Sequence, residues 1–344
     1  MPSEIELFHT GDLHFGACRR VHEYMHRIDC VCEGILAVVD ASKAKHKVVV
    51  VAGDLMDGKH PTEEERCRAL RFVLDLVHRR IHVVMTNGNH DFVNEDGVTM
   101  LDIFIQIQRL ESKYLHIVTN NPGVVDIQGI EASFLCVPCR QNLTTSKLKK
   151  ILSGLKSKAK HKLCYGVVHE AINGSISSDT HTMKTDCDAP EIDGIRGLML
   201  GDIHKCQKVG NRAWYCGSPY QTKFNEDKHK GLLVWRPEND DPELVLLRGV
   251  PKLIETSDAK ELKKYENTKH TVHYVGTEHP EIDSPNITVH PNLKLVREST
   301  TVARVVEETR HSALLGLKEH LKHDGLSEDE IEEGYADAEK ELAR

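Results

Sequence analysis

Apolar residues gather in short runs along the first third of the chain, and each run ends in a polar segment that contains glycine. The run at residues 48–52 is unbroken and β-branched, which predicts a strand buried on both faces. Residues 4–9 and 81–85 predict strands before and after it. The central strand stops at Gly53, which permits a sharp turn and leaves Asp54 at the strand's carboxyl end. By itself this Gly-Asp turn is more typical of a surface turn than of a metal site.

Two helices are expected between these three strands. Apolar residues at helical spacing predict one helix over residues 21–45. The second begins at Thr62, which forms a capping box with Glu65, and runs to about residue 80. The repeated strand-helix order predicts a layered α/β sheet whose polar strand ends lie side by side.

The next part of the chain predicts a second set of strands. Residues 115–137 alternate in short runs broken by turn residues, which is typical of antiparallel hairpins. Four further strands are expected at residues 162–168, 197–200, 231–235 and 244–247. The first ends at His169 and the second at the segment 201–204. Together these elements predict a four-layer α/β/β/α sandwich.

A change of composition after residue 250 divides the chain into three predicted regions. Residues 1–250 form the sandwich, and residues 251–310 form a small α+β domain with prolines between its elements. Residues 311–344 are expected to be helical and become acidic after Ser327. That acidic run is either a docking surface or a solvated helix face.

Seven lysines lie between Lys147 and Lys162, interleaved with leucines at helical spacing. This pattern predicts an amphipathic helix with a cationic face. A solvated surface helix is the simpler interpretation, and contact with a DNA backbone is the functional one.

The composition suits a globular chain, with 39% apolar and 28% charged residues. No apolar stretch approaches the length of a membrane span, and the first residues do not follow the pattern of a signal peptide, so we expect a cytoplasmic protein without a membrane partner. The 10 cysteines predict reduced thiols rather than a zinc ribbon or a disulfide framework. A net charge of -8 excludes a uniformly basic coat but leaves room for a local basic patch.

Side chains that can bind a metal follow the predicted strands at their carboxyl ends. They are Asp12, His14, Asp54, Asn89, His90, His169, Asp202 and His204. Carboxylate, imidazole and amide groups suit divalent Mn, Mg, Fe or Zn. One carboxylate that bridges two ions can hold them about 3.5–4 Å apart, the spacing that clamps a phosphoryl group and generates a bound hydroxide. Each motif alone fits a turn or a core histidine, whereas five in order on successive strands indicate a two-metal site.

The order of these motifs resembles the signature of the calcineurin-like metallophosphoesterases. The elements are Asp12-Leu13-His14, Gly53-Asp54-Leu55-Met56-Asp57, Gly88-Asn89-His90-Asp91, His169 and Gly201-Asp202-Ile203-His204. Within that superfamily the chain is similar to SbcD-type nuclease subunits of recombination and repair complexes. The segments that carry this similarity are 215–219, 224–226 and 230–231. The resemblance covers roughly residues 4 to 248 and implies the four-layer metallophosphoesterase fold, with residues 251–310 as a capping domain that presents DNA.

The resemblance also implies a role for each site residue. One metal ion is expected to bind Asp12, His14, Asp54 and His204. The other is expected to bind Asp54, Asn89, His169 and Asp202, so that Asp54 alone is shared. His90 is expected to contact the scissile phosphate as a general acid, with Asp91 orienting it.

Asp202 departs from the family pattern, which usually has histidine at this position. A carboxylate adds negative charge and favours Mn²⁺ or Mg²⁺ over softer ions. We therefore expect two divalent ions, with Mn²⁺ as the first choice, and Asp202 as a ligand; the alternative is that Asp202 only supports the ligands. The short chain and this departure also suit a divergent, bacteriophage-encoded member acting in the host cytoplasm.

The implied activity is that of a metal-dependent DNA exonuclease on duplex ends and endonuclease on single strands. The implied partners are DNA, an SbcC-type ABC ATPase docked on the C-terminal helices, and a second copy of the chain. A phosphomonoesterase or cyclic-nucleotide phosphodiesterase on the same metal core is the alternative enzyme. A non-catalytic scaffold is the third hypothesis, and it predicts missing ligands, whereas every expected position carries a group that can bind metal.

Overall fold

A computed structural model of the chain describes residues 3–19, 21, 23–93, 97–110, 113–139, 142–177, 181–276, 280, 282 and 284–289. The described chain forms two compact units. The first comprises residues up to 254 together with 267–271, and the second comprises 255–266 and the described residues from 272 onward. The helices expected over 311–344, with their acidic run, lie outside the described residues. The roles predicted for the three sequence regions stay predictions.

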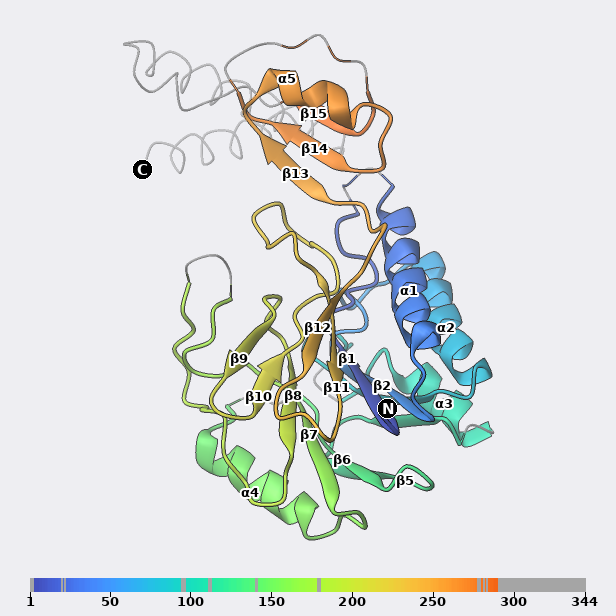
Figure 1. Cartoon of the computed structure of the whole chain (residues 1–344), viewed down its shortest axis with the longest axis vertical. Helices are drawn as coiled ribbons and strands as arrows, with labels where there is room; N and C mark the ends of the chain where they lie inside the picture. The colour runs from blue at the N-terminus through green and yellow to red at the C-terminus, as the bar shows by residue number, and fades with distance from the viewer. Residues whose placement is uncertain are drawn as a thin grey trace, which may run out of the picture. The chain divides into compact units, whose positions relative to one another are not determined.

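The first unit contains two six-stranded sheets (Figure 1). The first sheet has the order β12-β11-β1-β2-β3-β4. Its strands are β1 (Ile5–Thr10), β2 (His46–Ala52), β3 (His82–Thr86), β4 (Leu115–Val118), β11 (Gly231–Trp235) and β12 (Glu243–Leu246). Strands β1 to β4 run parallel to one another, β11 pairs antiparallel with β1, and β12 pairs antiparallel with β11. The strand at residues 115–118, which we predicted as part of a hairpin, instead extends this parallel sheet.

Three helices belong to this half of the unit: α1 (Tyr24–Ala41), α2 (Glu63–His78) and α3 (Asp102–Leu110). The predicted capping box of α2 is confirmed, because the Thr62 side chain accepts from the Glu65 N–H at 3.2 Å and the Glu65 carboxylate accepts from the Thr62 N–H at 2.7 Å. The sequence pattern did not predict α3, which is only 9 residues long.

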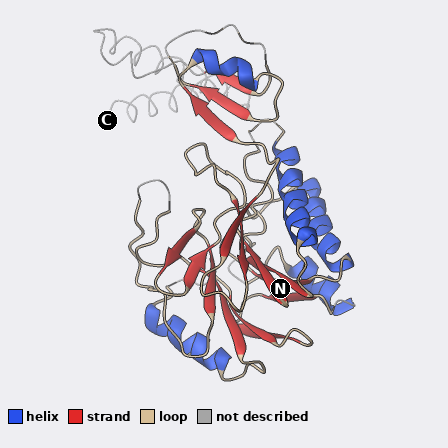
Figure 2. Ribbon diagram, in the orientation of Figure 1, coloured by secondary structure: helices blue, strands red, loops and turns tan. Residues whose placement is uncertain are grey.

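The second sheet has the order β5-β6-β7-β8-β10-β9. Its strands are β5 (Gly123–Ile127), β6 (Ala132–Val137), β7 (Leu163–His169), β8 (Gly197–Gly201), β9 (Gln207–Val209) and β10 (Ala213–Tyr215). The β5–β6 pair is the expected antiparallel hairpin, whereas β6, β7 and β8 run parallel. Helix α4 (Thr145–Lys156) lies against the outer face of this sheet (Figure 2). Its buried leucines pack on the sheet.

Three apolar layers hold the sandwich together. In β2, Val49 and Val51 pack toward the helices, while Val48 and Val50 pack toward the second sheet. A third cluster joins the second sheet to α4. The strand is therefore buried on both faces as predicted, and the α/β/β/α architecture is confirmed.

The lysine-rich segment, residues 147–162, ends where β7 begins. The metal-binding motifs lie at the opposite end of β7. Helix α4 ends at Lys156, and β7 begins at Leu163 and reaches His169 only at its last residue. Seven strand residues span about 20 Å, so lysines 156–162 lie that far from the end of the sheet that carries His169.

The described residues from 253 onward carry a three-stranded sheet of order β13-β14-β15, and both β13 and β14 begin within the residues assigned to the first unit. Its elements are β13 (Leu253–Thr256), α5 (Ala259–Leu262), the short 3-10 helix η1 (Lys263–Tyr265), β14 (Thr271–Tyr274) and β15 (Ile287–Val289). These elements have the mixed α+β content expected after residue 250. Across the described residues, no helix is long and apolar enough to cross a membrane.

Candidate metal centre

The loops that leave β1, β2 and β8 have unusual backbone conformations. Asp12, His14, Asp54 and Asp202 all adopt positive φ, at 49°, 44°, 51° and 97°. Such conformations are costly for residues other than glycine and persist only when the surroundings fix them. Two backbone hydrogen bonds join the loop after β1 to the loop after β2 and fix their conformations. The Asp12 N–H donates to the Gly53 carbonyl at 3.1 Å, and the His14 N–H donates to the Asp54 carbonyl at 3.0 Å.

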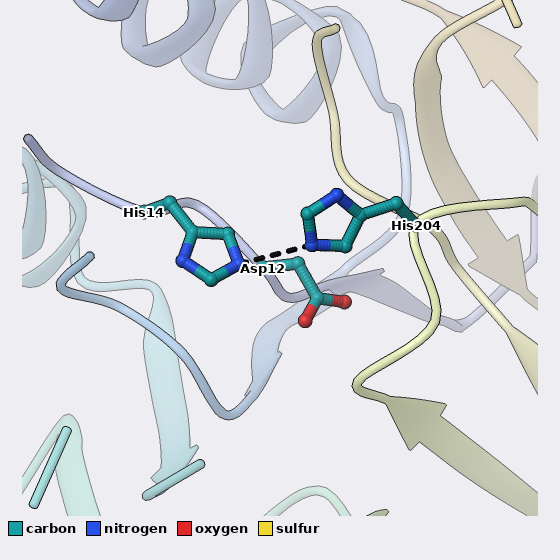
Figure 3. Close-up of side chains that lie close together, drawn as sticks. All are labelled: Asp12, His14 and His204. Carbon is teal, nitrogen blue, oxygen red and sulfur yellow. Dashed lines mark hydrogen bonds between the residues drawn. The ribbon is translucent and has the colours of Figure 1, made fainter. Parts of the chain in front are cut away.

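Asp12, His14 and His204 form the first group of possible metal ligands (Figure 3). The two imidazoles approach Nε2 to Nε2 at 3.0 Å. His204 Nδ1 lies 2.9 Å from a Glu226 carboxylate oxygen, and His14 Nδ1 lies 3.3 Å from an Asp57 carboxylate oxygen. A carboxylate only accepts, so His204 Nδ1 carries a proton and its Nε2 is turned toward His14, whose Nδ1 makes no hydrogen bond among the described residues. Two imidazole nitrogens grouped with the Asp12 carboxylate in this way fit a metal ion.

Asp12, Asp54 and His169 form the second group. His169 is buried, and its Nδ1 donates to the Ala52 carbonyl at 2.8 Å. Its Nε2 faces three oxygens: Asn89 Oδ1 at 3.0 Å, Asp54 Oδ2 at 3.5 Å and Asp202 Oδ1 at 3.7 Å. This donor set also fits a divalent cation.

Asp54 lies between the two groups. Its Oδ2 is 3.6 Å from His14 Nε2 and 3.5 Å from His169 Nε2, and its Oδ1 accepts from the His90 N–H at 2.9 Å. A third possible ligand group unites His14, Asp54 and His90. Asp54 is thus placed where a bridging ligand would stand. It is not unique in this respect, because Asp12 and His14 each belong to two groups as well.

The electrostatics of this edge favour positive charge. Burial raises the pKa of Asp54, but His169, His14 and His90 lower it further, so that its pKa stays well below the usual range. Burial lowers the pKa of His169, yet the Asp54, Asp12 and Asp202 carboxylates raise it well above its ordinary value. The buried carboxylates thus create a negative potential in which cations are retained.

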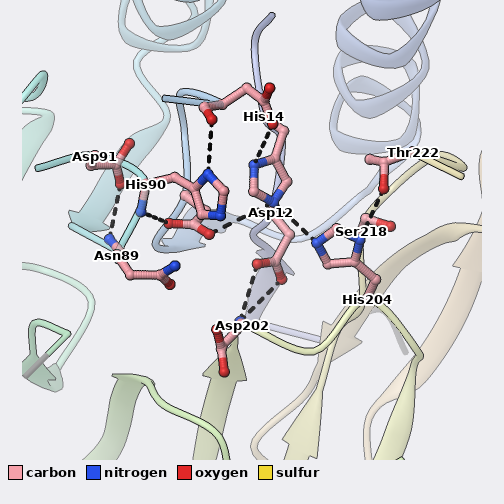
Figure 4. Close-up of polar contacts among 12 residues, drawn as sticks. Asp12, His14, Asn89, His90, Asp91, Asp202, His204, Ser218 and Thr222 are labelled. Carbon is pink, nitrogen blue, oxygen red and sulfur yellow. Dashed lines mark hydrogen bonds and ion pairs between the residues drawn. The ribbon is translucent and has the colours of Figure 1, made fainter. Parts of the chain in front are cut away.

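His90 and Asp91 follow β3, and Figure 4 shows both on the side of Asp12 and His14 away from His204. The His90 ring is exposed, and its Nδ1 lies 2.8 Å from the Asp57 carbonyl oxygen. The fully buried Asp91 carboxylate instead accepts from the backbone N–H groups of Leu55, Met56 and Gly88, at 3.3, 2.9 and 2.9 Å. The contact expected between Asp91 and His90 is therefore replaced by the Asp57 carbonyl, and Asp91 fixes the turn that carries Asp54.

Asp202 lies at the rim of the centre. Its N–H donates to both carboxylate oxygens of Asp12, at 3.1 and 3.3 Å, and its side chain is 26% exposed. Burial and the Asp12 and Asp54 carboxylates raise its pKa, while His169 lowers it. Asp202 belongs to none of the three ligand groups found among the described residues. Its role as a ligand stays a prediction.

A support for His204 that the motif analysis missed comes from the loop after β10. Besides its bond to His204, Glu226 accepts from the Thr222 N–H at 3.0 Å and from the Lys230 ammonium at 3.0 Å. That ammonium also donates to the His204 carbonyl at 2.8 Å and to Ser218 Oγ at 2.9 Å. Burial raises the pKa of Glu226, but His204 and Lys230 bring it down to about 2. Glu226 and Lys230 lie in the segments 224–226 and 230–231, which the sequence analysis used only for their family resemblance.

Two glycines allow ligand side chains to lie directly against the backbone. A Cβ atom on Gly53 would lie 2.2 Å from His169 Nδ1, and one on Gly88 would lie 2.1 Å from Asp54 Oδ1. Gly53 also has a φ of 87°. Both positions require glycine because the ligand side chains lie directly against the backbone.

The fold and this donor set define a metallophosphoesterase, and comparison of sequences agrees. Residues 5–206 match the family profile of calcineurin-like phosphoesterases, so the chain belongs to that family of metal-dependent phosphoester hydrolases.

Two curated relatives are similar to part of this chain. The DNA double-strand break repair protein Mre11 of Methanosarcina acetivorans is 26% identical over 241 residues, which cover 68% of this chain and 37% of the relative. The protein of the same name from Saccharolobus solfataricus is 21% identical over 295 residues, covering 83% of this chain and 65% of the relative. The chain thus matches less than two thirds of the length of either relative. Among solved structures, the calcineurin-like phosphoesterase YfkN of Bacillus subtilis aligns with 71% of this chain and 89% of its own, with a TM-score of 0.40 and 11% identity.

Proposed function

We propose that the chain is a two-metal DNA nuclease of recombination and repair, acting as an exonuclease on duplex ends and an endonuclease on single strands. The observation that carries the proposal is the convergence of seven donor side chains at one edge of the sandwich. They are Asp12, His14, Asp54, Asn89, His169, Asp202 and His204. The weak similarity to two DNA repair proteins supports DNA as the substrate.

The chain's own residues have distinct tasks in this proposal. Asp12, His14 and His204 would hold one ion, Asn89, His169 and Asp202 the other, and Asp54 would contact both. When bound, the ions supply Lewis acidity and an activated water for in-line attack on the phosphodiester.

His90 is suited to contact the substrate. The ring is exposed at the mouth of the centre, and the Asp57 carbonyl holds its Nδ1–H, so that Nε2 is free to carry a proton toward the leaving oxygen. Its backbone N–H bond to Asp54 couples the position of His90 to the proposed bridging ligand.

The ions proposed are Mn²⁺ first and Mg²⁺ second, because oxygen donors dominate the second group and Asp202 adds another carboxylate. The proposed partners are an SbcC-type ABC ATPase and a second copy of the chain, and the proposed location is the cytoplasm. Removing the residues after Ser312 should abolish binding of the ATPase, measured by co-purification; unchanged binding would contradict a docking role for that region.

The decisive experiment is Mn²⁺-dependent cleavage of duplex and single-stranded DNA, with Asp54→Asn and His90→Ala beside the unmodified protein. Both substitutions should reduce DNA cleavage by at least about 100-fold. A small phosphomonoester and a cyclic nucleotide are assayed in parallel. Efficient hydrolysis of either without DNA cleavage would replace the nuclease proposal by the phosphatase or phosphodiesterase alternative, and inactivity toward all substrates would favour the scaffold.

A further inference from the structure

A pocket of about 380 Å³ adjoins the metal centre and shares His204 and Glu226 with it. Its remaining wall includes Ser177, Lys205, Phe224, Asn225, Lys228 and His229. We call this hollow the flanking pocket. The proposed chemistry at the metal centre leaves these six side chains without a task.

The charged groups of the flanking pocket divide into engaged and available ones. Glu226 and Lys230 pair with each other at 3.0 Å and brace His204. The Asp227 carboxylate accepts from the His229 N–H at 2.8 Å and lies 3.1 Å from its Nδ1. Among the described residues, no side-chain hydrogen bond or ion pair engages the ammonium groups of Lys205 and Lys228. Two available ammonium groups beside a phosphoesterase centre fit a second phosphate of the substrate.

Phe224 and Asn225 give the pocket features that a phosphate alone would not need. Phe224 is half-buried and lies in the wall next to the exposed Asn225. An aromatic face is the usual platform on which an unpaired base stacks, and a carboxamide offers both donors and an acceptor to the edge of a base. The pocket volume lies at the small end of the range for ligand sites and suits one nucleotide rather than several.

We propose that the flanking pocket binds one unpaired nucleotide of a DNA strand, next to the phosphate that is cleaved, with its base on Phe224 and its phosphate on Lys205 and Lys228. This inference rests on the proposed nuclease function and deepens it. A base inside a duplex is covered on both faces by its neighbours, so stacking on Phe224 requires a single strand or a frayed end. The pocket therefore selects unpaired DNA at the metal centre.

The test measures binding without catalysis. A short fluorescein-labelled oligothymidylate is titrated with the full chain in EDTA, and fluorescence anisotropy is followed over a range of salt concentrations. Phe224→Ala should weaken binding about tenfold, because the stacking of one base is lost. Phe224→Trp should restore it. Lys205→Ala and Lys228→Ala should each reduce the salt slope by about 0.7.

Controls separate the pocket from general effects. Lys158→Ala is the matched charge control, because Lys158 is exposed and precedes β7 at the end remote from His169. It should leave affinity and salt slope unchanged. Circular dichroism checks that each variant is folded, and Phe224→Trp keeps the test valid if Phe224→Ala is not.

Three outcomes would overturn the inference while the nuclease proposal stands. They are oligothymidylate binding by Phe224→Ala equal to that of the unmodified protein, an equal loss of affinity for blunt duplex and single strand, and tighter binding of oligouridylate than of oligothymidylate. Failure of the unmodified protein to bind or cleave any DNA would instead refute the proposed function.

Discussion

Replacing Glu226 by glutamine removes a charge at the point where the metal centre is braced, and keeps the size of the side chain. In the native chain this carboxylate accepts from His204 Nδ1 at 2.9 Å and from the Lys230 ammonium at 3.0 Å. The exposed fractions of the Glu226 and Lys230 side chains are only 8% and 10%. An amide in its place offers His204 a neutral acceptor and leaves the Lys230 charge without a counter-ion.

Two effects follow, and their sizes can be worked out separately. The free energy of unfolding of the metal-free protein should fall by about 3 kcal/mol, the usual loss when one partner of a buried ion pair is removed. The affinity for one Mn²⁺ ion should fall about 10- to 100-fold, because a carboxylate behind a metal-binding imidazole fixes its tautomer and raises its basicity. That loss corresponds to about 1.4–2.8 kcal/mol of binding free energy.

The two quantities are measured by urea unfolding in EDTA and by calorimetric titration with Mn²⁺. Glu243→Gln is the matched control, since Glu243 pairs with Arg236 at 2.7 Å but is 60% exposed, and it should change neither quantity appreciably. If folded Glu226→Gln binds Mn²⁺ as tightly as the unmodified protein, then Glu226 does not position His204 as a ligand and the reasoning fails.

Three further predictions concern other parts of the first unit. Gly88→Ala should abolish tight Mn²⁺ binding in calorimetry because its Cβ would meet Asp54 Oδ1 at 2.1 Å, whereas Gly154→Ala, with no atom within 4 Å, should bind Mn²⁺ normally and gain about 0.5–1 kcal/mol of stability. Thr62→Ala should lose about 0.5–2 kcal/mol in urea unfolding through the lost helix cap, and Thr62→Ser should lose much less. Burial lowers the pKa of His116 from 6.5 to about 4. Between pH 6.5 and pH 4 this histidine is therefore protonated in the unfolded chain but neutral in the folded chain, so the free energy of unfolding falls as the pH is lowered through this range. The free energy of unfolding of His116→Gln should therefore fall about 1–3 kcal/mol less than that of the unmodified protein between pH 7 and pH 4. An equal pH dependence of the two proteins in urea unfolding would contradict this assignment.

The chain's local patterns predicted much of the fold correctly. The valine run of β2, the capping box of α2 and the polar ends of β1, β2, β3, β7 and β8 are all where the sequence placed them. Each of these features depends on residues within a few positions of one another, so the hydrophobic period and the turn chemistry suffice. The strand at residues 115–118 was misplaced because its alternation is compatible with either sheet, and only pairing with β3 decides between them.

The candidate site shows the same division more sharply. The sequence by itself determined which donor types stand at the strand ends, and hence that carboxylates and imidazoles converge. Only the tertiary structure decided which nitrogen of His204 is turned to His14, a residue 190 positions away, and that Glu226 fixes that choice. It also decided that the Asp57 carbonyl, rather than Asp91, holds the His90 ring. A tautomer and a ring orientation are set by the partners that packing brings within about 3 Å, and no pattern along the chain encodes those distances.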